Sequence, residues 1–187
     1  MSLSHLEELT GILRRSAWEH ALAETLVAGK ARGVVLLSLH RFGILNTVVG
    51  HAHGDEVLVA IADALPKDGL VLGRWGGDKF AAVVLKEEAV EVARSLWCAA
   101  SEVYASYETQ AVRDFAAEID HLKVTVAKRE GLYEQAALAK EGSILGVTAV
   151  ALILDATSLS SETVLRKISR AYWHADVSSR GRLVVSR

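Results

Sequence analysis

Apolar residues follow a helical period in the first part of the chain and then form one continuous run. From Arg15 to about Lys30 they recur three and four positions apart, which predicts an amphipathic helix that ends before Gly33. The run GVVLLSLHRF at 33–42 is apolar over most of its length. Such a run is typical of a central strand covered on both faces, so a buried strand is expected after the helix.

A second helix and a hairpin are expected next. The apolar residues from Asp55 to Leu65 again have helical spacing, with Asp55 placed to cap the N-terminus. Two strand-like runs, 69–75 and 80–85, then flank the sequence Gly-Gly-Asp at 76–78. A short glycine turn between two such runs predicts a β-hairpin.

The second half of the chain contains more helical spacing, two further strand candidates and a closing helix and strand. In order, these are a helix from Glu87 to about Ile119 with a break at 106–109, strands at 122–130 and 144–154, a helix at 162–177 and a strand at 182–186. This order of elements predicts an α/β sandwich with a mixed sheet and helices on its faces. We expect one domain over 1–187, with 1–14 as a lead-in segment.

Composition narrows the class of protein. The 187 residues carry a formal net charge of -2, which does not favour broad electrostatic binding to nucleic acid. The single cysteine excludes an internal disulfide and fits a reducing cytosol. The chain shows no signal-peptide pattern and no apolar run of the ~20 residues that a membrane span needs. A cytoplasmic protein without a membrane partner is therefore expected.

Four separated stretches carry a family resemblance. They are LTGI at 9–12 with Arg15, LSLHRFGILN at 37–46, GHAHGDEVL at 50–58 and RWGGDKF at 74–80. A further stretch, AYWHADVSSRGRLVV at 171–185, resembles the closing helix and strand of the same family. In this order they resemble a GGDEF domain, the diguanylate cyclase domain of bacterial cyclic-di-GMP signalling. The resemblance implies the nucleotidyl-cyclase-like or palm-like fold, with a mainly antiparallel central sheet. Residues 106–146 are longer than the corresponding region of the family, and either LKVTV or GVTAV can be its next strand.

The family reaction joins two GTP molecules, one on each of two facing domains, with divalent metal on the phosphates. The hairpin acid of such a site is present as Asp78. Ser38 and His40 stand where the family has aspartates on the first strand, Lys79 replaces the signature glutamate, and Asp176 replaces a lysine of the closing helix. Loss of these charges predicts loss of cyclase activity. Lys79 is open to two interpretations: a solvated lysine at a strand end, or an ammonium that replaces metal charge.

The positions for guanine recognition are better kept. The resemblance assigns nucleotide binding to six residues: Phe42, Asn46, Asp55, Gly76, Gly77 and Arg180. A carboxylate can accept hydrogen bonds from the N1 and N2 donors of guanine, and an amide can both donate and accept. Equally, Asp55 can be a helix cap, Asn46 a turn residue and the glycines a simple hairpin turn. No cofactor is expected except Mg²⁺ with a bound nucleotide.

The inhibitory site of the family, an arginine and an aspartate placed before the hairpin, is not matched, since Lys67 and Leu70 stand there. Three hypotheses remain open. The first is a catalytically degenerate GGDEF domain that works as a regulatory or interaction module, with weak binding of GTP and a protein partner or a homodimer. The others are an active diguanylate cyclase with unusual metal ligation and a dimerisation scaffold that binds no nucleotide.

Overall fold

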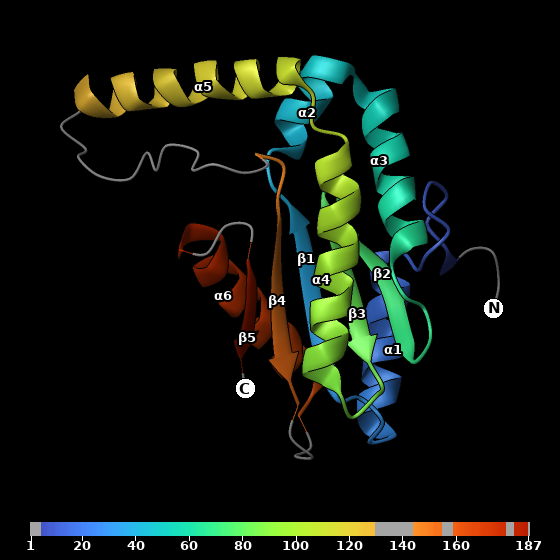
Figure 1. Ribbon diagram of the computed structural model, residues 1–187. Coiled ribbons are helices and arrows are strands. Elements are labelled where there is room, and N and C mark those ends of the chain that lie inside the picture. The colour runs from blue at the N-terminus through green and yellow to red at the C-terminus, as the bar shows by residue number, and fades with distance from the viewer. Residues whose placement is uncertain (1–4, 130–143, 155–158, 179–181, 187) are drawn as a thin grey trace.

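A computed structural model describes residues 5–129, 144–154, 159–178 and 182–186 of the chain, and Figure 1 shows its elements. In chain order they are α1 (Arg15–Val27), β1 (Gly33–Leu39), α2 (Phe42–Val49), α3 (His51–Ala64), β2 (Leu70–Gly76), β3 (Lys79–Val84), α4 (Ala89–Ser106), α5 (Gln110–Arg129), β4 (Val147–Ile153), α6 (Ser161–Ser178) and β5 (Leu183–Ser186). No helix in the described part of the chain is long and apolar enough to cross a membrane.

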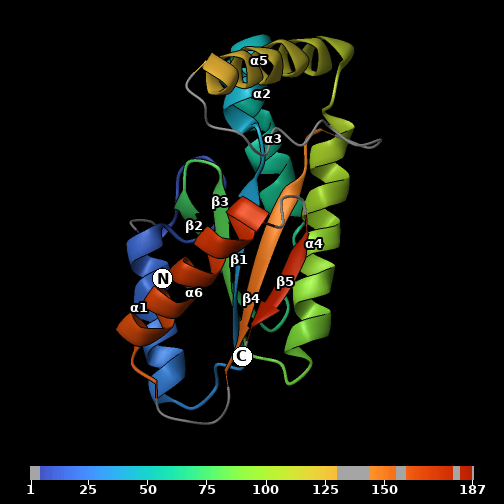
Figure 2. The ribbon, with the colours of Figure 1, turned by 90° about the vertical axis from the view of Figure 1, so that its left-hand side faces the viewer.

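The five described strands form one sheet in the order β2-β3-β1-β4-β5. All neighbouring pairs are antiparallel except β4 and β5, which are parallel. Figure 2 shows α1 and α6 on one face of the sheet and α4 on the other. The mixed, mainly antiparallel sheet flanked by helices confirms the fold class predicted from the sequence.

Strand β1 is buried along its whole length because both faces of the sheet are covered. Its side chains alternate between two hydrophobic clusters, so Val35 and Leu37 pack in the cluster that includes α3 and α4. Val34 and Leu36 pack in the cluster of α1 and α6. A continuous apolar run therefore serves two cores at once, as the sequence predicted.

The chain after β1 departs from the prediction. The strand ends at Leu39, and the last residue of the run expected as a strand, Phe42, begins helix α2. Arg41 makes the reversal in a left-handed conformation (φ 62°), which a non-glycine residue rarely adopts. Only the polar pair His40 and Arg41 separates the apolar residues of β1 from those of α2, so the change of period is weakly marked in the sequence.

Two further expectations are wrong. Asp55 does not cap α3, because that helix begins at His51 after Gly50, and Asp55 lies one turn inside it. The strand expected over 122–130 is helical through Arg129, since these residues continue α5, in which Val112 and Ala116 are buried one turn apart. The place beside β1 belongs to GVTAV, whose residues Val147 to Ile153 form β4. The expected break between the two long helices is confirmed at 107–109.

Candidate functional site

The Gly-Gly turn lies against the end of the first strand. Gly77 and Asp78 form the turn between β2 and β3, and the backbone N–H of Leu39 donates to the carbonyl of Asp78 over 3.0 Å. Neither Gly76 nor Gly77 is among the glycines with positive φ, and a Cβ on either would meet nothing within 4 Å. The hairpin predicted from the sequence is therefore confirmed. Its glycines leave the backbone of the turn uncovered, and the turn conformation does not itself require them.

Arg74 clamps this turn to the N-terminal segment. Its Nε and Nη2 donate to the carbonyls of Gly76 and Gly77 over 3.0 and 2.5 Å. Its Nη1 lies 3.8 Å from Oε2 of Glu7, and Thr10 donates to that carboxylate from its N–H and its hydroxyl. The sequence prediction gave Glu7 no role, and the signal that could have indicated one is its place three residues before Thr10.

Burial and neighbouring charges together shift the pKa values of the two charged residues of this clamp. Burial lowers the pKa of Arg74, while the charges of Glu7, Asp55 and Asp78 oppose the change. For Glu7, burial raises the pKa, but the hydrogen bonds from Thr10 and the charge of Arg74 outweigh it and hold the pKa below its usual value. Since Asp55 and Asp78 both act on Arg74, the guanidinium lies in the electrostatic field of both candidate site acids.

The residue that replaces the first-strand carboxylate is buried and engaged. Ser38 is 3% exposed and stands opposite Lys79 of β3 and Thr148 of β4 in the sheet register. The hydroxyl of Tyr172, from α6, donates to Oγ of Ser38 over 2.9 Å. A polar row therefore crosses three strands beneath α6, at the end of the sheet that carries the hairpin turn.

Lys79 lies in the middle of this arrangement. Its Nζ is 2.7 Å from Oδ1 of Asp78 and 5.7 Å from the ring centre of Tyr172. Both side chains of the ion pair are about one-third exposed (29% and 33%), so the pair is partly screened by solvent. The Lys79 ammonium therefore pairs with the hairpin acid at a partly exposed position.

These residues do not fit a divalent metal. Magnesium prefers several hard oxygen ligands, usually with at least one or two carboxylates. The Ser38 oxygen is neutral and accepts from Tyr172, and the Asp78 carboxylate is held by a cation. Within the described residues, no group of three or more His, Cys, Asp or Glu side chains is arranged to hold a metal ion. The local chemistry is that of an ion pair between neighbouring residues that is partly open to solvent.

Of the other two replaced positions, the structure describes the side chain of His40 but not that of Asp176. His40 hydrogen-bonds through Nε2 to Oγ1 of Thr148, and its carbonyl accepts from the Tyr104 hydroxyl over 2.7 Å. Burial, and next the charge of Asp78, raise the pKa of Tyr104. His40 is thus part of the packing below the site. Asp176 lies in α6, but its side chain is outside the described part, as is the whole of Arg180.

Two of the predicted nucleotide-binding residues, Phe42 and Asn46, meet Gly54 where α2 packs on α3. Gly54 has no side chain, and a Cβ there would lie 1.9 Å from Oδ1 of Asn46 and 3.3 Å from Cζ of Phe42. Oδ1 of Asn46 is buried and has no hydrogen-bond partner in the structure. Asp55 follows Gly54 directly and is exposed. The structure therefore brings Phe42 and Asn46 together against Gly54, with Asn46 in a helix and not in a turn, and Asp55 is the next residue along α3.

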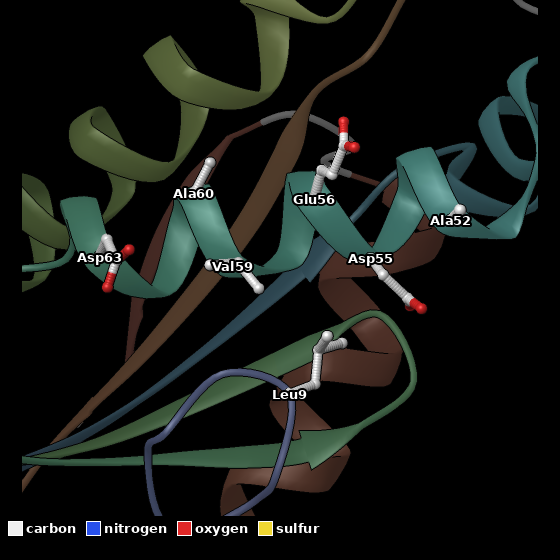
Figure 3. A pocket seen from close by; sticks show the side chains of 7 residues that line it. All are labelled: Leu9, Ala52, Asp55, Glu56, Val59, Ala60 and Asp63. Carbon is white, nitrogen blue, oxygen red and sulfur yellow. The ribbon is translucent and has the colours of Figure 1, made fainter.

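Asp55 lines a groove between α3 and the N-terminal segment (Figure 3). The groove has a volume of about 430 Å³, and Leu9 faces the helix across it. Val59 and Ala60 line it further along α3, and Asp63 lies toward its far end. The exposed carboxylate of Asp55 thus opens onto a mainly apolar surface.

The close packing at Gly54 yields a direct stability prediction. Gly54→Ala should lower the free energy of unfolding by about 2 kcal/mol, because the added methyl group overlaps the Asn46 amide. Gly43→Ala is the matched control: Gly43 lies in α2, its Cβ position is open, and the change should stabilise by about 0.5–1 kcal/mol. Urea denaturation of both variants measures the difference, and equal effects would contradict the packing described.

The two positions of the family's inhibitory site differ in their surroundings. Lys67 is exposed, with its Nζ 4.0 Å from Oδ1 of Asp63. Leu70 begins β2 and packs against the hydrophobic core. The pair offers no carboxylate at the second position, and the absence of inhibition through it stays a prediction.

Comparison with known proteins identifies the class. The family profile "Diguanylate cyclase, GGDEF domain" matches residues 4–126. Solved GGDEF structures share the fold: that of DgcB from Caulobacter crescentus with c-di-GMP aligns over 98% of this chain and 86% of its own, with a TM-score of 0.67 and 18% identity. Diguanylate cyclase SiaD of Pseudomonas aeruginosa, in complex with its activator SiaC, aligns over 98% and 62%, with a TM-score of 0.68 and 18% identity.

Relatives in sequence point to the same family. Cyclic di-GMP phosphodiesterase PdeB of Shewanella oneidensis is 30% identical over 116 residues, which are 59% of this chain and 13% of PdeB. Diguanylate cyclase VdcA of Vibrio cholerae is 30% identical over 111 residues, 58% of this chain and 32% of VdcA. The chain thus spans a third or less of these relatives. It belongs to the GGDEF domain family of cyclic-di-GMP signalling.

Proposed function

We propose that this GGDEF domain does not synthesise cyclic di-GMP and acts as a regulatory or interaction module in cyclic-di-GMP signalling. The observation that carries the proposal is the ion pair between Lys79 and Asp78, 2.7 Å apart, beside the neutral Ser38. An ammonium stands next to the one hairpin carboxylate that a metal would use. In this proposal, the Lys79 ammonium supplies the positive charge that a bound metal ion would otherwise supply.

The chemistry of the family reaction supports this proposal. A 3′-hydroxyl must lose its proton and attack an α-phosphate in line, and divalent metal neutralises the charge that develops. Lys79 is fixed toward Asp78, and Ser38 offers only a hydroxyl that already accepts from Tyr172. No described side chain near Ser38 supplies the missing anion, because the neighbours of Ser38 in the register are Lys79 and Thr148. Loss of charge at two ligand positions is expected to cost several orders of magnitude in rate.

Weak guanine-nucleotide binding is the second part of the proposal. The exposed carboxylate of Asp55 can accept hydrogen bonds from the N1 and N2 donors of guanine. Asn46 is partly buried on the neighbouring helix, and its amide can donate to or accept from the base once Oδ1 turns away from Gly54. The acidic Asp176, which stands in place of the family's lysine, would repel a triphosphate and keep the affinity low.

A protein partner completes the proposed role. Among the structural neighbours, SiaD was solved with its activator SiaC, and two DgcB structures were solved with c-di-GMP. PdeB, a relative of this chain, is a phosphodiesterase much longer than the matched region. A GGDEF fold can therefore accompany activities other than synthesis, which is the kind of setting we propose for this chain.

Calorimetry tests the nucleotide part of the proposal. GTP should bind with a dissociation constant on the order of 1 mM, and the constant should be the same in Mg²⁺ and in EDTA, because the site has its own cation. Asn46→Ala should remove the binding, whereas Thr47→Ala, on the exposed side of α2, should leave it intact. Binding that requires Mg²⁺ would contradict the assignment of Lys79 as counter-charge. Absence of any binding would leave only a scaffold function.

A further inference from the structure

The outer face of α6 carries an unusual set of exposed side chains. Arg166, Lys167 and Arg170 are all exposed, and Trp173 is 70% exposed. Arg166, Arg170 and Trp173 are spaced four and three residues apart, so they form one stripe along the helix. We call these four residues the α6 stripe.

The cations of the α6 stripe differ from most others in the described part of the chain. Elsewhere, arginines and lysines pair with acids, as in Arg15–Glu19, Arg32–Glu87, Arg41–Asp120, Lys79–Asp78, Lys86–Asp68 and Arg113–Glu108. Among the described residues, no acid forms an ion pair with the three cations of the stripe. Trp and Arg are the residue types most enriched where protein interfaces carry their binding energy.

An apolar groove flanked by acidic residues lies on the opposite face of the sheet, along α3. The groove along α3 is lined by Leu9, Ala52, Val59 and Ala60, and Leu9 is 37% exposed. Asp55 and Asp63 flank this apolar floor along α3 (Figure 3), and eight residues of helix separate them by about 12 Å. We call these six residues the α3 groove.

We propose that the α6 stripe of one copy docks in the α3 groove of a second copy. Trp173 would lie on the floor near Leu9 and Ala52, with Arg170 beside Asp55 and the long side chain of Arg166 directed toward Asp63. The three-residue step from Trp173 to Arg170 matches the step from Ala52 to Asp55, about 4.5 Å of helix in each case. An apolar anchor with charge pairs beside it is a common arrangement in protein interfaces.

The partner must be another molecule, because the two surfaces lie on different sides of the same sheet. α6 packs on the layer of α1, whereas α3 packs on the layer of α4 (Figures 1 and 2). A contact between unlike surfaces either closes into a ring or a reciprocal dimer, or continues as a chain. A nucleic acid is a poorer occupant of the stripe, since the charge of the whole chain is -2.

This association goes beyond the proposed function and does not depend on it. It does have a consequence for that function, because docking covers Asp55. A guanine nucleotide at Asp55 and a second copy in the α3 groove would compete. By thermodynamic linkage, GTP should then weaken self-association by the same factor by which self-association weakens GTP binding.

Charge reversal tests the docking. The stripe variant carries Arg166→Glu and Arg170→Glu, and the groove variant carries Asp55→Arg and Asp63→Arg. Sedimentation velocity from ~1 to ~500 μM should give self-association of the unchanged protein, about 100-fold weaker association for each variant, and recovery in their equimolar mixture. Trp173→Ala should weaken association by about 30-fold or more without altering the charge.

Lys30→Glu with Arg94→Glu is the matched control for the stripe variant, because both residues are exposed, lie outside α6 and give the same change of charge. This control should associate like the unchanged protein, and circular dichroism should show that all variants are folded. A monomer at every concentration, or a mixture that stays monomeric, would overturn the docking. Neither result bears on GTP binding or turnover, which test the proposed function.

Discussion

Ser38→Asp combined with Lys79→Glu should convert the ion pair into a metal site. Because Ser38 and Lys79 are direct partners in the sheet register, the two new carboxylates would face each other beside Asp78. Three acids would then converge where the unchanged protein has one acid and one ammonium. We expect Mn²⁺, measured by calorimetry or paramagnetic resonance, to bind at least ~100-fold more tightly than to the unchanged protein.

The same variant should also show coupling between metal and stability. Without metal, repulsion among three acids should lower its melting temperature, and Mn²⁺ should raise it again by mass action. Ser38→Ala with Lys79→Ala is the matched control, since it removes the hydroxyl and the ammonium but adds no carboxylate. Equal Mn²⁺ affinity in the two double variants would show that these positions do not face a common metal site. Recovery of cyclic-di-GMP synthesis would show in addition that the rest of the site is intact.

Trp18→Ala should cause the largest loss of stability among single replacements in α1, about 3–5 kcal/mol. Trp18 is 1% exposed, and its Nε1 donates to the carbonyl of Val71 over 2.9 Å. The side chain lies against Gly73, where a Cβ would come within 2.6 Å of the Trp18 Cβ. Removing the indole leaves a cavity beneath the hairpin strand β2 and removes its hydrogen bond to that strand.

Trp173→Ala is the control for this prediction. Trp173 is 70% exposed, so its replacement should change the unfolding free energy of the monomer by no more than about 0.5 kcal/mol. Urea denaturation at low protein concentration measures both variants without the contribution of self-association. A loss at Trp18 no greater than that at Trp173 would contradict the anchoring of β2 by α1.

Much of the fold could be predicted because local pattern and tertiary context agree. The apolar run of β1 is buried on both faces, and the Gly-Gly turn lies between two strands that pair as expected. The errors occur where pattern and context diverge. Phe42 follows the strand after only two polar residues but begins a helix, and the β-branched residues of LKVTV belong to α5, while β4 occupies the place beside β1 in the sheet. Local propensity is overridden in both cases.

The candidate site could be predicted only in part. The replaced charges at Ser38 and Lys79 can be seen in the sequence, and their pairing follows from the hairpin register. The contribution of Tyr172 could not be foreseen, because its hydroxyl reaches Ser38 from a helix 134 positions along the chain. Likewise, Asp55 looked like a helix cap until the start of α3 at His51 placed it one turn inside the helix.

The central claim is that Lys79 has taken the place of metal charge and that synthesis of cyclic di-GMP is lost. The most direct test is chromatographic measurement of cyclic di-GMP after incubation of the protein with GTP and Mg²⁺ or Mn²⁺. Asp78→Ala serves as the matched blank, because it removes the one hairpin acid that is left. We expect no product above this blank with either metal. Steady formation of cyclic di-GMP that disappears in Asp78→Ala would contradict it.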